Sequence, residues 1–102
     1  GDEGHFTITA AHEPATPVTG DNTLVLLVES TEHDVEGLTI TLEPWMPAHG
    51  HGSNTTPTVT EEGDGKYRVD DVVYTMPGVW QARIGIQGDD VEDTITFEYA
   101  VQ

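Results

Sequence analysis

Two kinds of metal-binding side chain lie close together between Trp45 and Ser53, in the stretch WMPAHGHGS. It contains one thioether, Met46, and two imidazoles, His49 and His51. Imidazole nitrogen is a borderline ligand that suits Cu, Zn and Ni, whereas thioether sulfur is soft and suits Cu(I) much better than Zn(II). A site that combines both donors therefore points to copper.

The two histidines are separated by a single glycine. Side chains two residues apart in an extended segment project to the same side, so both rings can converge on one ion. Gly50 and Gly52 allow the backbone turns that other residues resist. Because a His-x-His pair also occurs in zinc sites and by chance, the pair alone leaves a metal site and a solvated surface loop as alternatives.

A second thioether, Met76, lies far along the chain in the segment YTMPGVW. Its Met-Pro sequence next to a tryptophan repeats the local context of Met46. Loops at one end of a β-sandwich cluster, so Met76 can meet Met46, His49 and His51 there. The alternative is that Met76 only fills the core, as methionine often does.

Composition excludes several other kinds of chemistry. The chain has no cysteine, which removes disulfides, thiolate metal sites and thiol nucleophiles. Its only serines are Ser30 and Ser53, and neither lies in a nucleophile elbow. Paired carboxylates are too frequent in this acidic chain to indicate a glycosidase. We therefore expect a protein that is not an enzyme.

The charge of the chain is strongly negative. Nineteen Asp and Glu residues face only Lys66, Arg68 and Arg83, for a net charge of -16. Nucleic acids and anionic membranes need Lys and Arg, so we expect neither as a partner. The acidity indicates either adaptation to a saline exterior or attraction for cations and basic partners. No apolar run is long enough to span a membrane, and we expect a monomer.

The elements that must hold these donors show a period of two residues, which is typical of β-strands with one buried face. A length of 102 residues suits one domain over residues 1–102. Asp64-Gly65 is a strong hairpin signal. About seven strands without a helix predict an all-β, antiparallel, immunoglobulin-like β-sandwich, with strands near residues 6–10, 23–30, 37–42, 58–60, 66–74, 79–86 and 91–102.

The segment from Gly37 to Ile86 resembles the YtkA-like domain family, which is related to FixH. The similarity lies in an alternating strand followed by Met46-Pro47 with His51, by Gly65-Lys66-Tyr67, and by Met76-Pro77-Gly78-Val79-Trp80. Each motif is short, but their order and spacing together are moderately specific. Family members commonly carry methionine where this chain has Ala48 or His49, so the departure toward histidine enriches the site in nitrogen.

The resemblance implies an exported or membrane-tethered bacterial immunoglobulin-like domain, associated with copper handling or cytochrome oxidase biogenesis. We accordingly expect a periplasmic or extracellular domain. A membrane tether would be an N-terminal segment that has been removed from the sequence considered. The domain would hold copper, Cu(I) in preference to Cu(II), through Met46, His49, His51 and Met76. Storage, copper resistance, or transfer from a donor to an acceptor protein would be its role.

Two other interpretations stay open. The first is a structural or interaction module of a larger exported protein that binds no metal, in which Met46 and Met76 are buried apart from each other. The second is a zinc or nickel site in which His49 and His51 are joined by a carboxylate such as Glu43 or Asp64. The remaining histidines, which we expect to be solvated or peripheral, are His5, His12 and His33.

Overall fold

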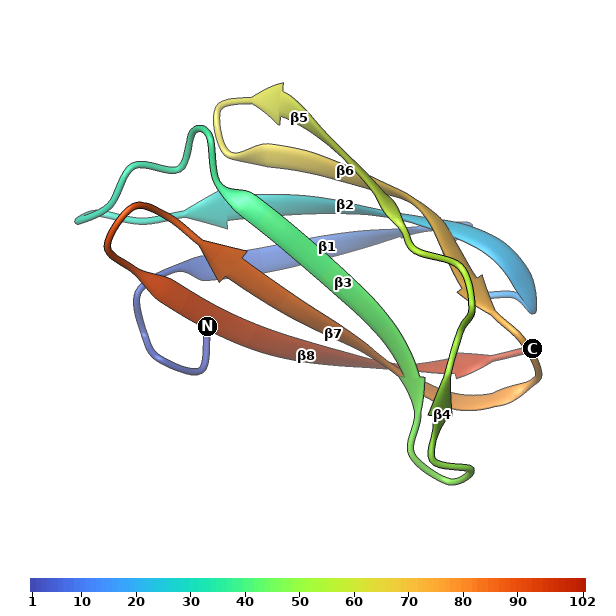
Figure 1. Ribbon diagram of the computed structural model, residues 1–102. Helices are drawn as coiled ribbons and strands as arrows, with labels where there is room; N and C mark the ends of the chain where they lie inside the picture. Colours follow the sequence, from blue (N-terminus) through green and yellow to red (C-terminus); the bar gives the residue numbers. More distant parts are fainter.

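The computed structural model describes residues 1–102 and is built from two antiparallel four-stranded sheets packed face to face (Figure 1). One sheet has the order β1-β2-β6-β5, and the other has the order β4-β3-β7-β8. The predicted immunoglobulin-like β-sandwich is confirmed, with eight strands where about seven were expected. The strands are β1 Thr7–Glu13, β2 Gly20–Glu29, β3 Thr39–Met46, β4 His51–Gly52, β5 Thr58–Gly63, β6 Lys66–Tyr74, β7 Gly78–Gln87 and β8 Glu92–Val101.

Alternating apolar residues on each strand supply the core between the sheets. Leu24, Leu26 and Val28 of β2 are almost completely buried. Opposite them, Trp80, Ala82, Ile84 and Ile86 of β7 point inward from the other sheet. Burial of each large apolar side chain is worth about 1.5–3 kcal/mol, so the period-two pattern determines which face of each strand is inside.

The hairpin signal at Asp64-Gly65 is confirmed by the turn between β5 and β6. Both residues have positive φ, 55° for Asp64 and 82° for Gly65. A two-residue turn of this kind has the backbone twist that antiparallel neighbours require, and glycine and aspartate tolerate it better than most residues. The turn fixes the register of β6, whose bounds coincide with the predicted strand 66–74.

Strand β3 is longer than the sequence pattern predicts. It was expected to end near residue 42 but continues through Pro44 to Met46. The last inward-facing residues, Leu42, Pro44 and Met46, are all buried. Proline in a strand is tolerated where one side has no partner, and β4 pairs with β3 only at Trp45 and Met46.

The strand order places the connecting segments at two ends of the sandwich. The β3–β4 hairpin, the β6–β7 turn and the C-terminus lie toward the right of Figure 1. The N-terminus and the β2–β3, β5–β6 and β7–β8 connections lie toward the left. We call the first the Met/His end, defined by residues 46–52 and 75–78, and the second the N-terminal end. The molecule contains no helix able to cross a membrane.

Candidate metal site

The stretch around the two histidines folds as a β-hairpin. Met46 is directly opposite His51 in the register of β3 and β4, and Trp45 is opposite Gly52. In the turn, the backbone N–H groups of His49 and Gly50 donate to the carbonyl oxygen of Met46, at 3.2 and 2.9 Å. Gly50 has a φ of 62°, which glycine adopts without strain. The hairpin therefore holds its two imidazoles on a defined backbone.

His51 presents one free ring nitrogen. Its Nδ1 lies 3.1 Å from the carbonyl oxygen of Gly52. Because a carbonyl can only accept a hydrogen bond, Nδ1 carries a proton, and in the neutral imidazole the lone pair is then on Nε2. This is the arrangement in which a backbone carbonyl orients a histidine for metal coordination.

The second imidazole lies beside the first. The ring centroids of His49 and His51 are 5.8 Å apart, and the His49 ring is exposed while the His51 ring is half-buried. Two imidazoles that share one metal ion at the usual M–N distance place their centroids about 5–6 Å apart. The separation is therefore compatible with a shared ion.

The two methionines come from different parts of the chain. Met46 is only 3% exposed and points into the core. A Cβ placed on Gly78 would collide with the terminal methyl of Met46. Met76, two residues before Gly78, is half-buried against the same core. The side chain of Met46 thus contacts the turn that carries Met76.

The indole of Trp80 connects these segments. Its Nε1 donates to the carbonyl oxygen of Met76 at 2.9 Å, which fixes the β6–β7 turn. Its ring also contacts the edge of the His51 ring, with centroids 5.7 Å apart. Trp80 is fully buried, as expected for core packing. The fold consequently brings Met46, His49, His51 and Met76 to one end of the sandwich.

One part of the sequence prediction needs correction. The Met/His site was expected on a loop, but Met46 belongs to strand β3 and its side chain is buried. The reason is that the inward alternation of Leu42 and Pro44 continues to residue 46. Burial of Met46 agrees with the metal-free interpretation, while the methyl of Met46 lies against Gly78, two residues from Met76 in the chain.

A zinc or nickel site with a carboxylate is not assembled. Nowhere in the molecule do three or more His, Asp or Glu side chains form a group that could hold a metal ion. Glu43 is exposed on the outer face of the β3–β7–β8 sheet. Asp64 lies in the β5–β6 turn at the N-terminal end, with its N–H bonded to Glu36 (Figure 1). Neither can join His49 and His51 in this structure.

The other three histidines lie outside the site. His12 on β1 has both ring nitrogens engaged, with Nδ1 2.8 Å from the carbonyl oxygen of Pro14 and Nε2 3.1 Å from the Tyr74 hydroxyl. His5 and His33 are at the N-terminal end, where their rings lie edge to face at 5.4 Å. The expectation that they are peripheral to the four predicted ligands agrees with these positions.

The two tryptophans occupy different environments. Trp80 is in the core beneath the hairpin, whereas Trp45 is on the outer face with the guanidinium of Arg83 4.8 Å from its ring centre. From the sequence, Trp80 was expected to pack in the core or at its rim and to shield a Cu(I)-thioether site from water, while Gly78 had no role beyond its place in the Met76-Pro77-Gly78-Val79-Trp80 motif. The hydrogen bond from the Trp80 indole to the Met76 carbonyl had no sequence signal, although Gly78 next to Met76-Pro77 was visible.

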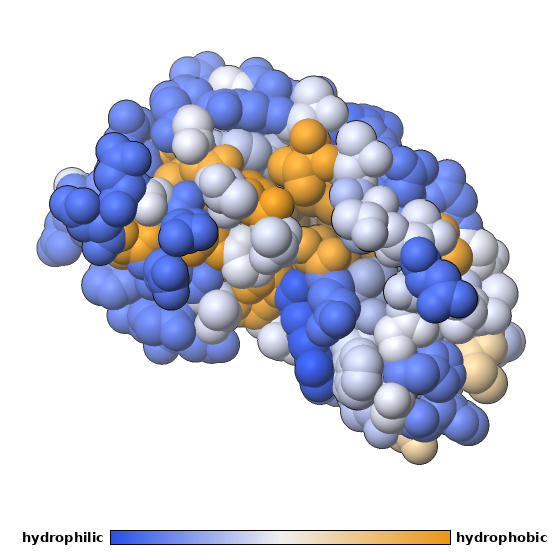
Figure 2. Space-filling view, viewed as in Figure 1, coloured by the Kyte–Doolittle hydropathy of each residue, from blue (hydrophilic) through white to orange (hydrophobic).

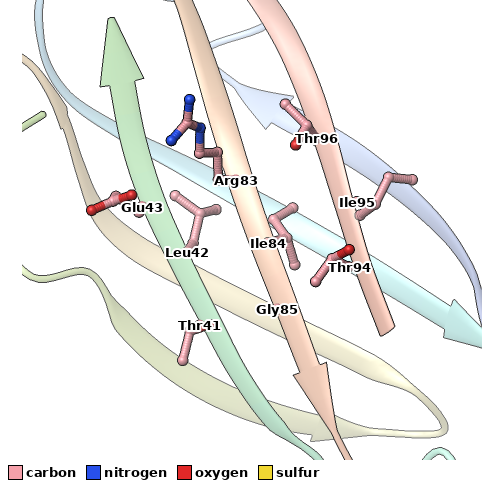
Figure 3. A pocket seen from close by; sticks show the side chains of 9 residues that line it. All are labelled: Thr41, Leu42, Glu43, Arg83, Ile84, Gly85, Thr94, Ile95 and Thr96. Carbon is pink, nitrogen blue, oxygen red and sulfur yellow. The ribbon is translucent and has the colours of Figure 1, made fainter. Parts of the chain in front are cut away.

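A shallow hollow of about 400 Å³ lies elsewhere, on the outer face of the β3–β7–β8 sheet (Figure 3). Gly85 has no side chain between Thr41 and Thr94, its neighbours across the sheet. Figure 2, which has the view of Figure 1, shows hydrophobic residues in the middle of the visible side of the molecule, surrounded by hydrophilic ones. None of the four predicted metal ligands lines the hollow.

Comparison with known proteins gives one relationship. No curated protein and no solved structure matches the chain. The model of the YtkA-like family matches residues 2–85, which include β1 to β6 and both methionine turns. On this match over most of its length, the chain belongs to the YtkA-like family.

Proposed function

We propose that this chain is a non-enzymatic, extracytoplasmic copper-binding domain that holds Cu(I) through Met46, His49, His51 and Met76. One observation carries the proposal: His51 is opposite Met46 across the hairpin, while the methyl of Met46 lies against Gly78 in the turn that carries Met76. Membership of the YtkA-like family, which is associated with copper, supports it.

The chemistry of the donors favours copper in its reduced state. Thioether sulfur binds Cu(I) well and Zn(II) poorly, and imidazole binds both oxidation states of copper. The chain offers no thiolate, so the sulfur must come from Met46 and Met76. With two imidazoles present, Cu(II) is the second ion that the site would accept.

The exposure of the four residues differs in a way that suits transfer. His49 is exposed, His51 and Met76 are half-buried, and Met46 is buried. An incoming ligand from a partner protein can therefore replace His49 first, while the inner donors still hold the ion. The negative surface would attract Cu(I) and a basic partner. We infer that copper is the cargo, received from one protein and passed to another.

A periplasmic or extracellular location fits this role, with a membrane tether as one form that it can take. The absence of cysteine suits an oxidising compartment, because no thiol has to be kept reduced. Location of the full-length protein in cell fractions checks this part of the proposal. Recovery of the protein with the cytoplasmic fraction would contradict it.

Anaerobic competition against a chromophoric Cu(I) chelator tests the binding site. Because Met46 is buried, Met46→Leu is preferable to alanine, since leucine preserves the volume and removes only the sulfur. We expect Met46→Leu, Met76→Leu and His51→Gln each to weaken Cu(I) binding at least about tenfold, or about 1.4 kcal/mol. His33→Gln, at the opposite end, is the matched control and should bind as the wild type does.

The same titration separates the alternatives. If all three site variants keep the wild-type affinity, copper binding at these residues is excluded. If Cu(I) binds no better than to a histidine-bearing peptide, the metal-free structural or interaction module becomes the better description. The burial of Met46 is the observation that favours that second candidate.

A further inference from the structure

Aromatic rings form a continuous path from the Met/His end across the core. The centroids of His51 and Trp80 are 5.7 Å apart, those of Trp80 and Tyr74 are 5.5 Å apart, and those of Tyr74 and His12 are 5.9 Å apart. Trp80 and Tyr74 have no exposed surface, whereas His12 is half-buried. The path begins on the β4–β3–β7–β8 sheet and ends on β1 of the other sheet.

The direction of the hydrogen bond at Tyr74 follows from its surroundings. His12 Nδ1 faces the carbonyl oxygen of Pro14 at 2.8 Å, so Nδ1 carries the proton. His12 Nε2 is then an acceptor, and the Tyr74 hydroxyl donates to it at 3.1 Å. A base is thus in place to take that proton when the phenol loses an electron.

Tyr67 provides a natural contrast. It is as deeply buried as Tyr74, at 1% exposure. Its hydroxyl donates to the carbonyl oxygen of Val35 at 2.6 Å and accepts the N–H of Leu38. No other aromatic ring lies against Tyr67, so it has no aromatic neighbour with which to exchange an electron. Only Tyr74 has both an aromatic neighbour and a proton acceptor.

We propose that Trp80, Tyr74 and His12 form an electron relay that removes oxidising equivalents from the Met/His end. When Cu(I) reduces hydrogen peroxide, the products are Cu(II), hydroxide and a hydroxyl radical. The radical takes one electron from the aromatic path and becomes hydroxide, which leaves Trp80 as a radical cation. Tyr74 returns one electron to Trp80 and passes its proton to His12 Nε2, giving a neutral tyrosyl radical and an imidazolium.

The relay is completed at the surface. His12 is half-buried and its ring also contacts Tyr99, with centroids 4.7 Å apart. A small-molecule reductant, such as a thiol or an enediol, supplies one electron from solvent, and the proton returns from His12 to Tyr74. The polypeptide is then unchanged, the reductant has lost one electron, and the copper is left as Cu(II). The benefit would be to Met46 and Met76, whose thioethers are otherwise oxidised to sulfoxides that bind Cu(I) poorly.

This role rests on the proposed function, but the path itself can be tested without copper. Copper-free protein is oxidised by a photogenerated one-electron oxidant, frozen rapidly, and examined by electron paramagnetic resonance. We expect a tyrosyl signal that disappears in Tyr74→Phe and persists in Tyr67→Phe. Each variant removes one buried hydroxyl, so each controls for the other, and thermal unfolding confirms that both are folded. A signal that survives in Tyr74→Phe would overturn the relay.

His12 acts as a positioning and proton-accepting residue, and His12→Phe isolates this role. Phenylalanine preserves a ring against Tyr74 but offers no base. The tyrosyl yield should fall several-fold, with the radical retained on Trp80 and distinguishable by its hyperfine pattern. An unchanged tyrosyl yield in His12→Phe would show that the proton goes elsewhere and would refute the assignment.

A second measurement tests the protective role. Copper-loaded protein is treated with hydrogen peroxide and a thiol, and sulfoxide at Met46 and Met76 is measured by peptide mass spectrometry. Tyr74→Phe should accumulate sulfoxide several-fold faster than wild type and Tyr67→Phe. Equal rates in copper-loaded samples would refute protection. Failure to load copper would refute the proposed function alone, since the copper-free radical experiment still decides the relay.

Discussion

At the N-terminal end of the sandwich, the carboxylate of Asp93 accepts the backbone N–H groups of Glu3, His5 and Phe6 at 2.9–3.0 Å. At the Met/His end, His51 uses only Nδ1, leaving Nε2 with a lone pair. At the N-terminal end, the side chain of Asp93 is used to hold backbone N–H groups in place. At the Met/His end, Nε2 of His51 has no hydrogen-bond partner in the chain and is available to a ligand from outside it.

The carboxylates of the N-terminal end follow the same rule. Glu61 accepts the N–H of Gly37 at 2.9 Å, and this bond lowers the pKa of Glu61. A side-chain hydrogen bond with Glu61 raises the pKa of Glu36, although Glu36 also accepts the N–H of Asp64. These acids stabilise turns. Acidic residues are therefore poor indicators of a site in this protein, whereas His51 keeps one ring nitrogen, Nε2, without a hydrogen-bond partner in the chain.

The largest effect on stability should come from Asp93→Asn. The carboxylate is 1% exposed, and its loss leaves buried backbone N–H groups without an acceptor of equal strength. We expect a loss of about 3 kcal/mol in the free energy of unfolding, measured by urea denaturation. Asp90→Asn, on an exposed turn, should change it by less than about 0.5 kcal/mol. A sharp fall in Cu(I) affinity of folded Asp93→Asn would contradict the independence of the two ends.

Gly78→Ala should be the next most disruptive change, and it acts at the Met/His end. The φ of Gly78 is 137°, and the new Cβ would collide with the methyl of Met46. We expect a loss of about 2 kcal/mol from backbone strain and overpacking. Gly20→Ala, with a φ of 104° and open space around it, measures the backbone part alone.

A double-mutant cycle sharpens this prediction. In a Met46→Ala background the collision is relieved, so the Gly78→Ala penalty should shrink by about 1 kcal/mol. Denaturation of the four proteins of the cycle gives the coupling. Strict additivity would mean that Met46 and the β6–β7 turn are energetically independent, and would weaken the case for one shared site.

Acid should act on the N-terminal end through Asp93. Burial alone would raise the pKa of this carboxyl, but the backbone N–H groups that donate to it outweigh burial and lower the pKa below its ordinary value. A depressed folded-state pKa means that the stability is present above the unfolded pKa and is lost as the pH falls through the folded one. We expect an added slope of up to about 1.4 kcal/mol per pH unit below about pH 4.

The variant Asp93→Asn supplies the comparison for the acid prediction. Denaturant titrations between neutral pH and strong acid should show the slope in wild type and a shallower dependence in the variant. Parallel curves for the two proteins would mean that another carboxylate dominates acid sensitivity.

The smallest effect is expected from Arg83→Gln. The Arg83 guanidinium lies 4.8 Å from the centre of the Trp45 ring on the exposed sheet face, where such contacts contribute about 0.5–1 kcal/mol. Denaturation should show a loss of that size, accompanied by a change in Trp45 emission, with Cu(I) affinity unaltered. A large change in affinity would show that the outer face is coupled to the Met/His end.

Much of the fold could be predicted because strand patterns are local. Lys66 to Tyr74 alternates cleanly and is bounded by Asp64-Gly65, so β6 was placed correctly. Prediction failed at Pro44, which usually ends a strand but is tolerated on β3 because that side has no partner there. Strand β4 has only two residues and exists because the hairpin folds back, a result that no two-residue pattern can indicate.

The candidate site was predictable in its donors and not in its geometry. Met46, His49, His51 and Met76 could be selected because thioether and imidazole have recognisable ligand chemistry. The burial of Met46, the contact of its methyl with Gly78 and the bond from Trp80 to the Met76 carbonyl depend on how the two sheets face each other.

By itself, the sequence determined the strand alternation, the turn at Asp64-Gly65 and the kinds of donor atoms that the chain carries. Only the tertiary structure decided that the methyl of Met46 lies against Gly78, next to the turn that carries Met76. It also decided that the Asp93 carboxylate accepts hydrogen bonds from backbone N–H groups 87 or more residues away in the chain. The reason is physical. Alternation specifies which face of a strand is buried, whereas contacts between distant segments depend on strand order, register and side-chain packing, which emerge only when both sheets close on one core.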